Sequence, residues 1–405
     1  MVTLPDTAEY ALLEVFVFLA LAELLIPLAG RARLPPVVAW IVLGIALSSF
    51  ALGGVVNRLL GVGLFTVNTY LLLFADLSVV LLLFAAGLGS GVRGLRDAGA
   101  AAVGAAIAGD LAPFAVTVLV AARFVPVPTA LLLGVAAAPT SAAVVASLRQ
   151  SEGIGETRAG RFLVNAAALD DVVALLLLTV VLTIVGGHVD VLSVTGSVAE
   201  SVVAWLVLLV AAVVVIPRAL RVPALREAKG VPFLFLFVLV AIVVALGFSA
   251  VIGAFIAGLA VAESLVADRT RELTEVLLLF FGALFFVVVG AQFDVHDLLL
   301  PALLGAGLGL AGLAALGKVA GVYGFARGRL GDPPAARAVA LGMIPRGEIG
   351  LVVGAIGLTS GLFGQTELAA IVLMSLATTV GGSWAFRRAV ARLPPSPGAE
   401  VPPTA

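Results

Sequence analysis

The sequence predicts an all-α polytopic membrane protein with thirteen transmembrane helices. Of its 405 residues, 62% are hydrophobic and only 12% are charged, and the mean hydropathy is +1.23. A soluble domain carries about twice that share of charged residues. The apolar residues also fall in runs of about 20, which is the length that a helix needs to cross a hydrocarbon layer about 30 Å thick.

Charged residues and clusters of Pro and Gly separate the apolar runs and delimit the predicted helices. The helices are placed near residues 10–29, 35–52, 66–89, 98–120, 129–148, 161–185, 192–216, 231–247, 249–265, 276–291, 298–325, 337–358 and 367–386. The first is not expected to be a cleaved signal peptide, because Asp6 and Glu9 precede its apolar run and no basic residue does. Residues 391–405 are rich in Pro and are expected to form a disordered tail.

The distribution of Lys and Arg predicts the orientation of the helices. With the N-terminus outside and the C-terminus in the cytoplasm, all but four of the 23 Lys and Arg residues fall in cytoplasmic segments. Arg58 and Arg123 lie in outside loops, and Lys318 and Arg346 lie within apolar runs. Because short cytoplasmic loops retain basic residues, this distribution supports both the orientation and the count of thirteen.

Thirteen helices can divide into two inverted six-helix repeats joined by one linker helix. The second helices of the two halves align Val37 with Val251, Gly44 with Gly258, and Ala46 with Ala260. The ends of the third helices also match, starting from Gly87 and Gly290. The fifth helix of each half contains a Pro in mid-span. These matches occur in the same order in both halves and together indicate an internal repeat.

Pro139 and Pro345 are expected to break the fifth and twelfth helices, because Pro removes a hydrogen bond and clashes with the preceding turn. Paired broken helices in inverted halves point to the substrate site of a carrier. Thr140 and Ser141 follow the first break, and their hydroxyls, with freed carbonyls, suit an oxygen-coordinated cation such as Na⁺. We therefore expect these two discontinuous helices to cross at the functional site.

Asp170 and Asp171 lie about 15 Å deep in the sixth predicted helix, at 1.5 Å per residue. A charge at that depth costs roughly 2.5–3.5 kcal/mol even on the most lenient scale, so each carboxylate requires a reason. Neighbouring helical residues point about 100° apart, so one carboxylate can face a cation cavity while the other faces a neighbouring helix. Two such acids titrate as a coupled pair and can release protons when a cation binds. The alternative is a buried pair that only joins helices.

Other ionisable residues also lie within the apolar runs. Lys318 is the only Lys in a predicted helix and is the natural counter-charge for one aspartate, unless its side chain reaches the interface. Arg346 and Glu348 lie beside the second break, and Asp76 and Asp110 lie in the third and fourth helices. We expect these four to form structural ion pairs that fasten the broken helix and neutralise its half-helix ends.

Composition excludes several classes of function. The formal net charge is −1, which leaves no basic surface to hold nucleic acid. There is no Cys and there are only two His residues, so we expect no disulfide, haem, metal centre or other cofactor. The string GLGLAG at 307–312 matches a dinucleotide fingerprint but follows no strand, so close helix packing is favoured. Glu14 and Glu23 receive no role.

Several motifs together resemble a known family. They are the broken helix PTS, the pair ALDD, the segments LGFSAVIGAFIAGL and FFVVVG, the lone Lys318, and GMIPRGEIGLVVGAIGL. Over essentially all thirteen helices, the chain is similar to bacterial Na⁺/H⁺ antiporters of the monovalent cation:proton antiporter superfamily, in its two-aspartate branch. The resemblance implies a homodimer in the lipid of the bacterial inner membrane that exchanges monovalent cations and protons by an elevator-like movement.

The resemblance also implies a division of the chain into domains. Residues 98–190 and 298–390 would form a core domain, and residues 1–97 and 231–297 would form a dimerisation domain. Residues 191–230 would provide the linker helix. The tail, 391–405, would belong to neither domain.

Residue roles follow from the resemblance by position. Asp171 would be the essential ligand for Na⁺ and protons, and Asp170 would pair with Lys318 until the ion arrives. Thr140 and Ser141 would flank the site. Asp76 with Arg346 resembles a structural acid and arginine pair of the family. The chain departs from its relatives at Gly89, where many have Glu, and at Ser141, where some have a third carboxylate.

The leading interpretation is electrogenic exchange of cytoplasmic Na⁺ or Li⁺ for external protons, and the chain is therefore not expected to be an enzyme. Exchange of K⁺ for protons is the alternative within the same fold. An intramembrane aspartyl protease is less favoured, because its two catalytic aspartates lie on separate helices, whereas Asp170 and Asp171 are adjacent. A cation channel is disfavoured because paired carboxylates with a lysine counter-ion suit coupled exchange.

Overall fold

The fold is described from a computed structural model that covers residues 6–32, 34–61, 63–91, 99–154, 157–186, 191–296 and 300–393. Every regular element in these ranges is a helix. The helices are α1 (Asp6–Arg31), α2 (Pro36–Leu47), α3 (Leu52–Leu60), α4 (Thr69–Ser90), α6 (Gly99–Ala121), α7 (Val127–Ala137), α8 (Ala142–Ser151), α9 (Arg158–Gly186), α10 (Val191–Ala219), α11 (Pro223–Glu227), α12 (Val231–Ala245), α13 (Ala250–Ala262), α14 (Ala267–Ala291), α15 (Pro301–Leu330), α16 (Pro333–Gly342), α17 (Glu348–Thr359) and α18 (Gln365–Val390). The all-α class is confirmed.

Each of the thirteen predicted segments falls on helical residues, but not all are single long helices. In the described ranges, nine helices are long and apolar enough to cross a membrane, or ten if α2 and α3, which meet at 41°, count as one. The helices α12, α13 and α17 are apolar but shorter. The chain is therefore a multi-pass membrane protein, while the count of thirteen crossings stays a prediction.

Local sequence signals fix where several helices begin and end. The Asn68 side chain accepts a hydrogen bond from the Leu71 N–H at 3.0 Å and caps α4. Asp332 caps α16 in the same way, accepting from Ala335 at 3.1 Å. Pro occupies one of the first two positions of α2, α7, α11, α12, α15 and α16, where its missing N–H costs nothing.

The inverted repeat is visible where helices of the two halves cross. Gly44 of α2 lies against Gly290 of α14, and Gly258 of α13 lies against Gly87 of α4. A Cβ at any of the four would lie 2.0–2.3 Å from a carbonyl oxygen of the facing helix. Since α2 aligns with α13 and α4 with α14, the same backbone contact is made twice with the halves exchanged. The paired glycines found in the sequence are thus the points of closest approach.

Replacing Gly258 with Ala is expected to lower the melting temperature of the purified protein by several degrees. The added methyl would overlap the carbonyl oxygen of Phe84 at 2.1 Å, so α4 and α13 must separate, at a cost of about 1–3 kcal/mol. Gly312→Ala is the matched control, because nothing lies within 4 Å of a Cβ there and Ala favours a helix. Equal melting temperatures for the two variants would contradict the close crossing.

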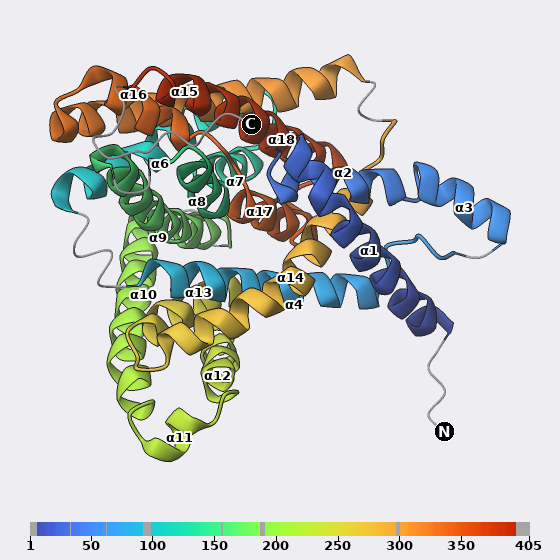
Figure 1. Cartoon of the computed structure of the whole chain (residues 1–405), viewed down its shortest axis with the longest axis horizontal. Helices are drawn as coiled ribbons and strands as arrows, with labels where there is room; N and C mark the ends of the chain where they lie inside the picture. Colours follow the sequence, from blue (N-terminus) through green and yellow to red (C-terminus); the bar gives the residue numbers. More distant parts are fainter. Residues whose placement is uncertain are drawn as a thin grey trace, which may run out of the picture.

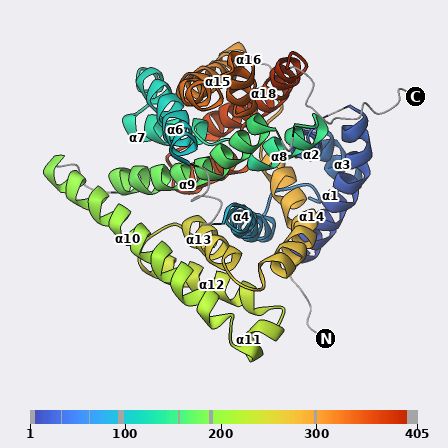
Figure 2. The same cartoon turned by 60° about the vertical axis from the view of Figure 1, so that its left-hand side comes forward.

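The helices pack in two groups with α9 between them. The helices α6, α7, α15, α16 and α18 lie together on one side of the molecule (Figure 2). The helix α4 crosses the middle of the other group and packs against α13 and α14 (Figure 1). The helix α9 contacts α6, α7 and α8 on one side and α10 and α4 on the other. The aspartates of α9 therefore lie where the two groups meet.

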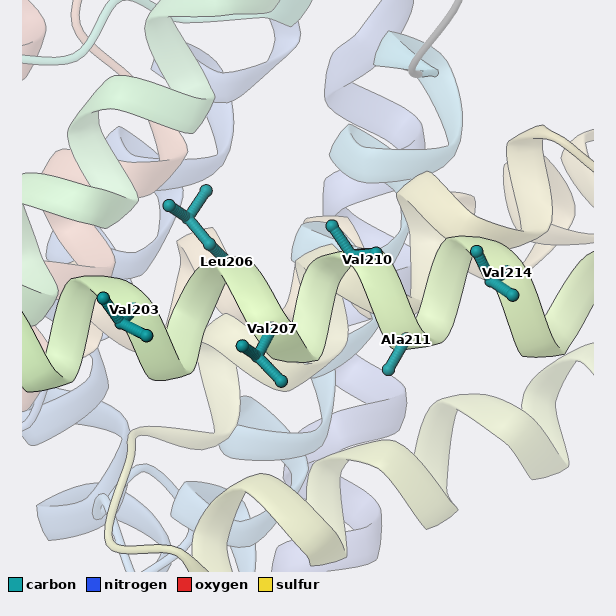
Figure 3. Close-up of a pocket in the computed structure, with 6 residues that line it drawn as sticks. All are labelled: Val203, Leu206, Val207, Val210, Ala211 and Val214. Carbon is teal, nitrogen blue, oxygen red and sulfur yellow. The ribbon is translucent and has the colours of Figure 1, made fainter.

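The helix α10 presents an apolar face to its surroundings. A shallow hollow on this face is lined by Val203, Leu206, Val207, Val210, Ala211 and Val214 (Figure 3). These side chains carry no polar atom that could hold an ion. A wide apolar face on a helix of this length suits contact with hydrocarbon.

Candidate cation site

The two helix breaks lie against each other in the interior. The first separates α7 from α8, and the second separates α16 from α17. The Ser141 N–H donates to the Pro345 carbonyl oxygen at 2.9 Å, and the Thr140 hydroxyl donates to the Met343 carbonyl oxygen at 2.8 Å. Backbone groups that a broken helix leaves unpaired are thus satisfied by the other break. The predicted crossing of two discontinuous helices is present.

The buried guanidinium of Arg346 lies where α7 and α16 end. Its Nη1 donates to the carbonyl oxygens of Pro139 and Met343, each at 3.2 Å, and its Nη2 donates to the carbonyl oxygen of Ala314 at 2.9 Å. Carbonyl groups at a helix C-terminus carry partial negative charge, so a cation there is favourable. One arginine therefore stabilises the C-terminal ends of both half-helices.

The Glu348 carboxylate lies where α8 and α17 begin. Glu348 is the first residue of α17, and it accepts a hydrogen bond from the Ser141 hydroxyl at 2.8 Å. It also accepts from the backbone N–H groups of Ala142 and Ala143 in the first turn of α8. A negative charge is favourable at a helix N-terminus. Arg346 and Glu348 thus lie at the half-helix ends as expected, but each offsets the charge of a helix dipole and the two do not form an ion pair.

Lys318 of α15 lies between two carboxylates that come from different helices. Its Nζ is 2.7 Å from Asp170 Oδ1 on α9 and 2.8 Å from Asp110 Oδ1 on α6. All three side chains are fully buried. The other oxygen of Asp170 accepts from the Thr140 N–H at 2.6 Å, which ties this carboxylate to the first helix break. Asp170 and Lys318 therefore form the expected pair, and Asp110 is a second carboxylate on the same lysine.

Asp171 is buried beside this network, yet one of its oxygens is unpaired. Its side chain is 1% exposed, and Oδ1 has no hydrogen-bond partner among the residues that the structure describes. A negative charge on Asp171 is repelled by Glu348, Asp170 and Asp110 and attracted by Lys318. A buried carboxylate oxygen without a donor is able to bind a cation or a proton.

The crossing carries an excess of negative charge. Its buried carboxyl groups are Asp110, Asp170, Asp171 and Glu348, and its buried basic groups are Lys318 and Arg346. If all were ionised, two negative charges would lack a counter-charge, which is unfavourable in a buried site. Two added positive charges, whether protons or a cation with a proton, would balance it.

The donor set suits a weakly held ion. No group of three or more His, Cys, Asp or Glu residues in the described ranges is arranged to hold a metal ion. The oxygens at the crossing instead come from carboxylates, the hydroxyls of Thr140 and Ser141, and the carbonyls of the breaks. Oxygen ligands of this kind suit a hard cation that must also leave.

The structure corrects two expected ion pairs. Asp76, predicted to pair with Arg346, is an exposed residue of α4, and both residues lie in the described part of the chain without a contact between them. The buried guanidinium of Arg346 is already used by backbone carbonyls, which explains why it needs no acid. Asp110, predicted to fasten the broken helix, is instead paired with Lys318.

Four further residues and the tail lie outside the crossing or outside the described residues. Glu14 is buried in α1, and its Oε2 has no partner among the described residues, while Glu23 is exposed. His296 is exposed and lies 2.9 Å from Asp294. His188 and residues 394–405 of the predicted tail lie outside the described residues.

A partly polar cavity of about 390 Å³ lies further along α9, toward its C-terminal end. It is lined by residues of α9, α10, α13 and the turn before α13, including Thr179, Thr183, Glu200 and Ser249. Thr179 is eight positions beyond Asp171, about 12 Å along the helix axis. The buried Leu175 lies on α9 between the carboxylate and the cavity.

Comparison of the sequence with models of protein families shows the family of this chain. Residues 16–390 match the family described as sodium/hydrogen exchanger, transmembrane. The chain belongs to this family. The match spans both helix breaks and every charged residue of the crossing. It confirms the resemblance to the cation:proton antiporter superfamily, and it confirms a transporter and not an enzyme.

Two relatives and a solved structure agree with this. The chain is 31% identical over 327 residues to the high-affinity Na⁺/H⁺ antiporter NhaS3 of Synechocystis sp., covering 75% of this chain and 68% of the relative. It is 26% identical over 385 residues to the Na⁺/H⁺-K⁺ antiporter GerN of Bacillus cereus, covering 91% and 94%. The sodium proton antiporter MjNhaP1 of Methanocaldococcus jannaschii at pH 8 superposes with a TM-score of 0.73 at 16% identity, covering 95% and 98%, so it shares the fold.

Proposed function

We propose that the chain is a secondary active transporter that exchanges cytoplasmic Na⁺, or Li⁺, for external protons. The observation that carries the proposal is the unpaired Asp171 oxygen inside a buried site whose carboxyl groups outnumber its basic groups by two. Such a site is stable only when it holds positive charge, and a cation and protons compete for the same oxygens. Alternate occupation by the two is what couples their movements.

The ligand roles follow from the contacts at the crossing. Asp171 binds the cation with its free oxygen, and Asp170 joins Asp171 as a ligand when its carboxylate separates from Lys318. Thr140 and Ser141 flank the ion with their hydroxyls. Arg346 and Glu348 hold the ends of the half-helices in place, and neither of them binds the cation. No cofactor takes part, and the transported ions are the only substrates.

The movement we propose is an elevator-like alternating access. The moving body would be the core domain of residues 98–190 and 298–390, with residues 1–97 and 231–297 forming the dimerisation domain of a homodimer. The partly polar cavity along α9, about 390 Å³, would be part of the external access route. The protein would lie in a bacterial inner membrane with its N-terminus outside and its C-terminus in the cytoplasm.

Exchange of K⁺ for protons is the second candidate. One relative, GerN, is described as an Na⁺/H⁺-K⁺ antiporter, and it aligns over 91% of this chain. Carboxylates and hydroxyls at a helix break coordinate either ion through oxygen. Selectivity then depends on the size of the site at Asp171, which both ions would share.

Transport by purified protein in proteoliposomes tests the proposal. With an acidic interior and a pH-sensitive dye, addition of Na⁺ should relieve quenching, because protons leave as the cation enters. Li⁺ should act like Na⁺, and K⁺ should give a weaker response. Choline chloride, which cannot enter the site, should give none. A response to none of the three metal cations would contradict the proposed function, and a response to K⁺ alone would favour the second candidate.

The apparent KM for Na⁺ is expected to rise as the pH falls. Protonation removes the charge of the carboxylates that bind the cation, so protons and Na⁺ compete. Initial rates in proteoliposomes over a range of Na⁺ and pH values measure the effect. The variant carrying His188→Ala and His296→Ala should give the same profile, since neither His lies at the crossing in the sequence-based topology. A shift of its activity curve by a pH unit or more would indicate a separate histidine sensor.

A further inference from the structure

Asp110 is a buried charge to which neither the family resemblance nor the proposed exchange assigns a role. It lies 2.8 Å from Lys318 Nζ, and its side chain is fully buried in α6. Its second oxygen, Oδ2, has no hydrogen-bond partner among the described residues. Asp170 differs, because it also accepts from the Thr140 N–H at 2.6 Å. The pairing with Lys318 is therefore the interaction that accounts for a charged Asp110 in this position.

The packing of α6 against α15 holds the Lys318 side chain beside Asp110. A Cβ on Gly109 would lie 3.3 Å from Lys318 Cδ and 3.6 Å from its Nζ, so the lysine side chain runs directly over this glycine. The same two helices approach closely where Gly317 faces Pro113, with 2.5 Å from a Cβ to the proline Cα. Small residues allow this approach of the two backbones. The α15 backbone that carries Lys318 is thereby held close to α6.

Asp170 and Asp110, the two partners of Lys318, differ in whether they also bind the cation. In the proposed exchange, Asp170 turns from the lysine to the arriving cation. An ammonium left without a carboxylate in a buried site is strongly unfavourable. Because Asp110 remains 2.8 Å away on a tightly packed helix, Lys318 keeps one carboxylate after Asp170 is released. The other charged groups at the crossing are Asp171, Glu348 and Arg346, and none of them forms an ion pair with Lys318.

We propose that Asp110 is a positioning residue that retains Lys318 when Asp170 binds the cation, and that it thereby sets the affinity for the cation. The proposal rests on the proposed function. Without Asp110, Asp170 is the only carboxylate partner that Lys318 keeps among the described residues, and the cation must displace the lysine from Asp170. Asp110 acts through Lys318 and does not touch the ion.

Calorimetric titration of Na⁺ into the detergent-purified protein tests this with a double-mutant cycle. Asp110→Asn should weaken Na⁺ binding by about fivefold to tenfold. In proteoliposomes the same variant should raise the apparent KM by a similar factor with little change in the maximal rate. In a Lys318→Gln background, Asp110→Asn should change the affinity no further. Thr117→Val, which removes another buried and unpaired side-chain oxygen from α6, should leave the affinity unaltered.

Several outcomes would overturn the proposal. An equal loss of affinity in the Lys318→Gln background would show that Asp110 acts independently of the lysine, and a lower maximal rate at unchanged KM would show a merely structural role. If a variant of the cycle does not fold or binds no Na⁺, Asp110→Glu decides: affinity near wild type supports the proposal, and a loss as large as tenfold overturns it. Absence of Na⁺ binding and exchange in the wild type would instead contradict the proposed function itself.

Discussion

Replacing Asp171 with Asn is expected to reduce Na⁺/H⁺ exchange to the background of empty liposomes while leaving the fold intact. The amide keeps the shape of the carboxylate but cannot be ionised, so it offers neither a charged cation ligand nor a site for a transported proton. Because Asp171 Oδ1 accepts no hydrogen bond from any described residue, its replacement breaks no hydrogen bond of that oxygen. Dye dequenching in proteoliposomes measures the rate, and the melting temperature reports the fold.

Asp76→Asn is the matched control for this variant. It removes a carboxylate from another membrane helix, α4, but this one is exposed, whereas Asp171 is buried. Its exchange rate should stay near that of the wild type. Exchange at the normal rate in Asp171→Asn, with Asp76→Asn also active, would refute the assignment of Asp171 as the ligand.

Replacing Arg346 with Met is expected to cause the largest loss of stability, about 3–5 kcal/mol, which is the typical cost of removing one member of a buried charged network. The guanidinium donates to the carbonyl oxygens of Pro139, Met343 and Ala314, and all three are left without this donor. The ends of α7 and α16 then lose the cation that offsets their dipoles. Thermal unfolding in detergent measures the change.

Arg123→Met serves as the control, because Arg123 is an exposed residue in the turn between α6 and α7. Its free energy of unfolding should change by no more than about 0.5 kcal/mol, as in a typical surface variant, and its melting temperature should stay near that of the wild type. If Arg346→Met melted at the same temperature as Arg123→Met, the guanidinium would not be holding the broken helices together.

Much of the fold could be predicted from sequence because its signals are local. Apolar runs of helical length determine the helices, and Pro139 and Pro345 determine the breaks, since the effect of Pro acts on its own turn. The glycines matched between the halves also proved structural, because Gly44 and Gly258 stand at equivalent helix crossings. The sequence does not predict the bend between α2 and α3, as no Pro lies at that point.

The site could be predicted only in part because its pairing is not local. Asp110 and Lys318 are 208 positions apart, and nothing in either segment indicates that α6 and α15 pack face to face. The partners of Arg346 are mainly backbone carbonyls, which every residue possesses and which a sequence therefore cannot single out. The expected pairing of Asp76 with Arg346 rests on position alone, and position does not reveal the face of α4 on which Asp76 lies.

The central claim is that Na⁺ and protons occupy the same buried carboxylates in turn. Proton release on cation binding tests it most directly, measured with a pH indicator in weakly buffered solutions of the detergent-purified protein. Addition of NaCl should acidify the solution, choline chloride should not, and Asp171→Asn should abolish the signal. Calorimetric binding of Na⁺ to the wild type without any release of protons, at every pH where exchange occurs, would contradict the account.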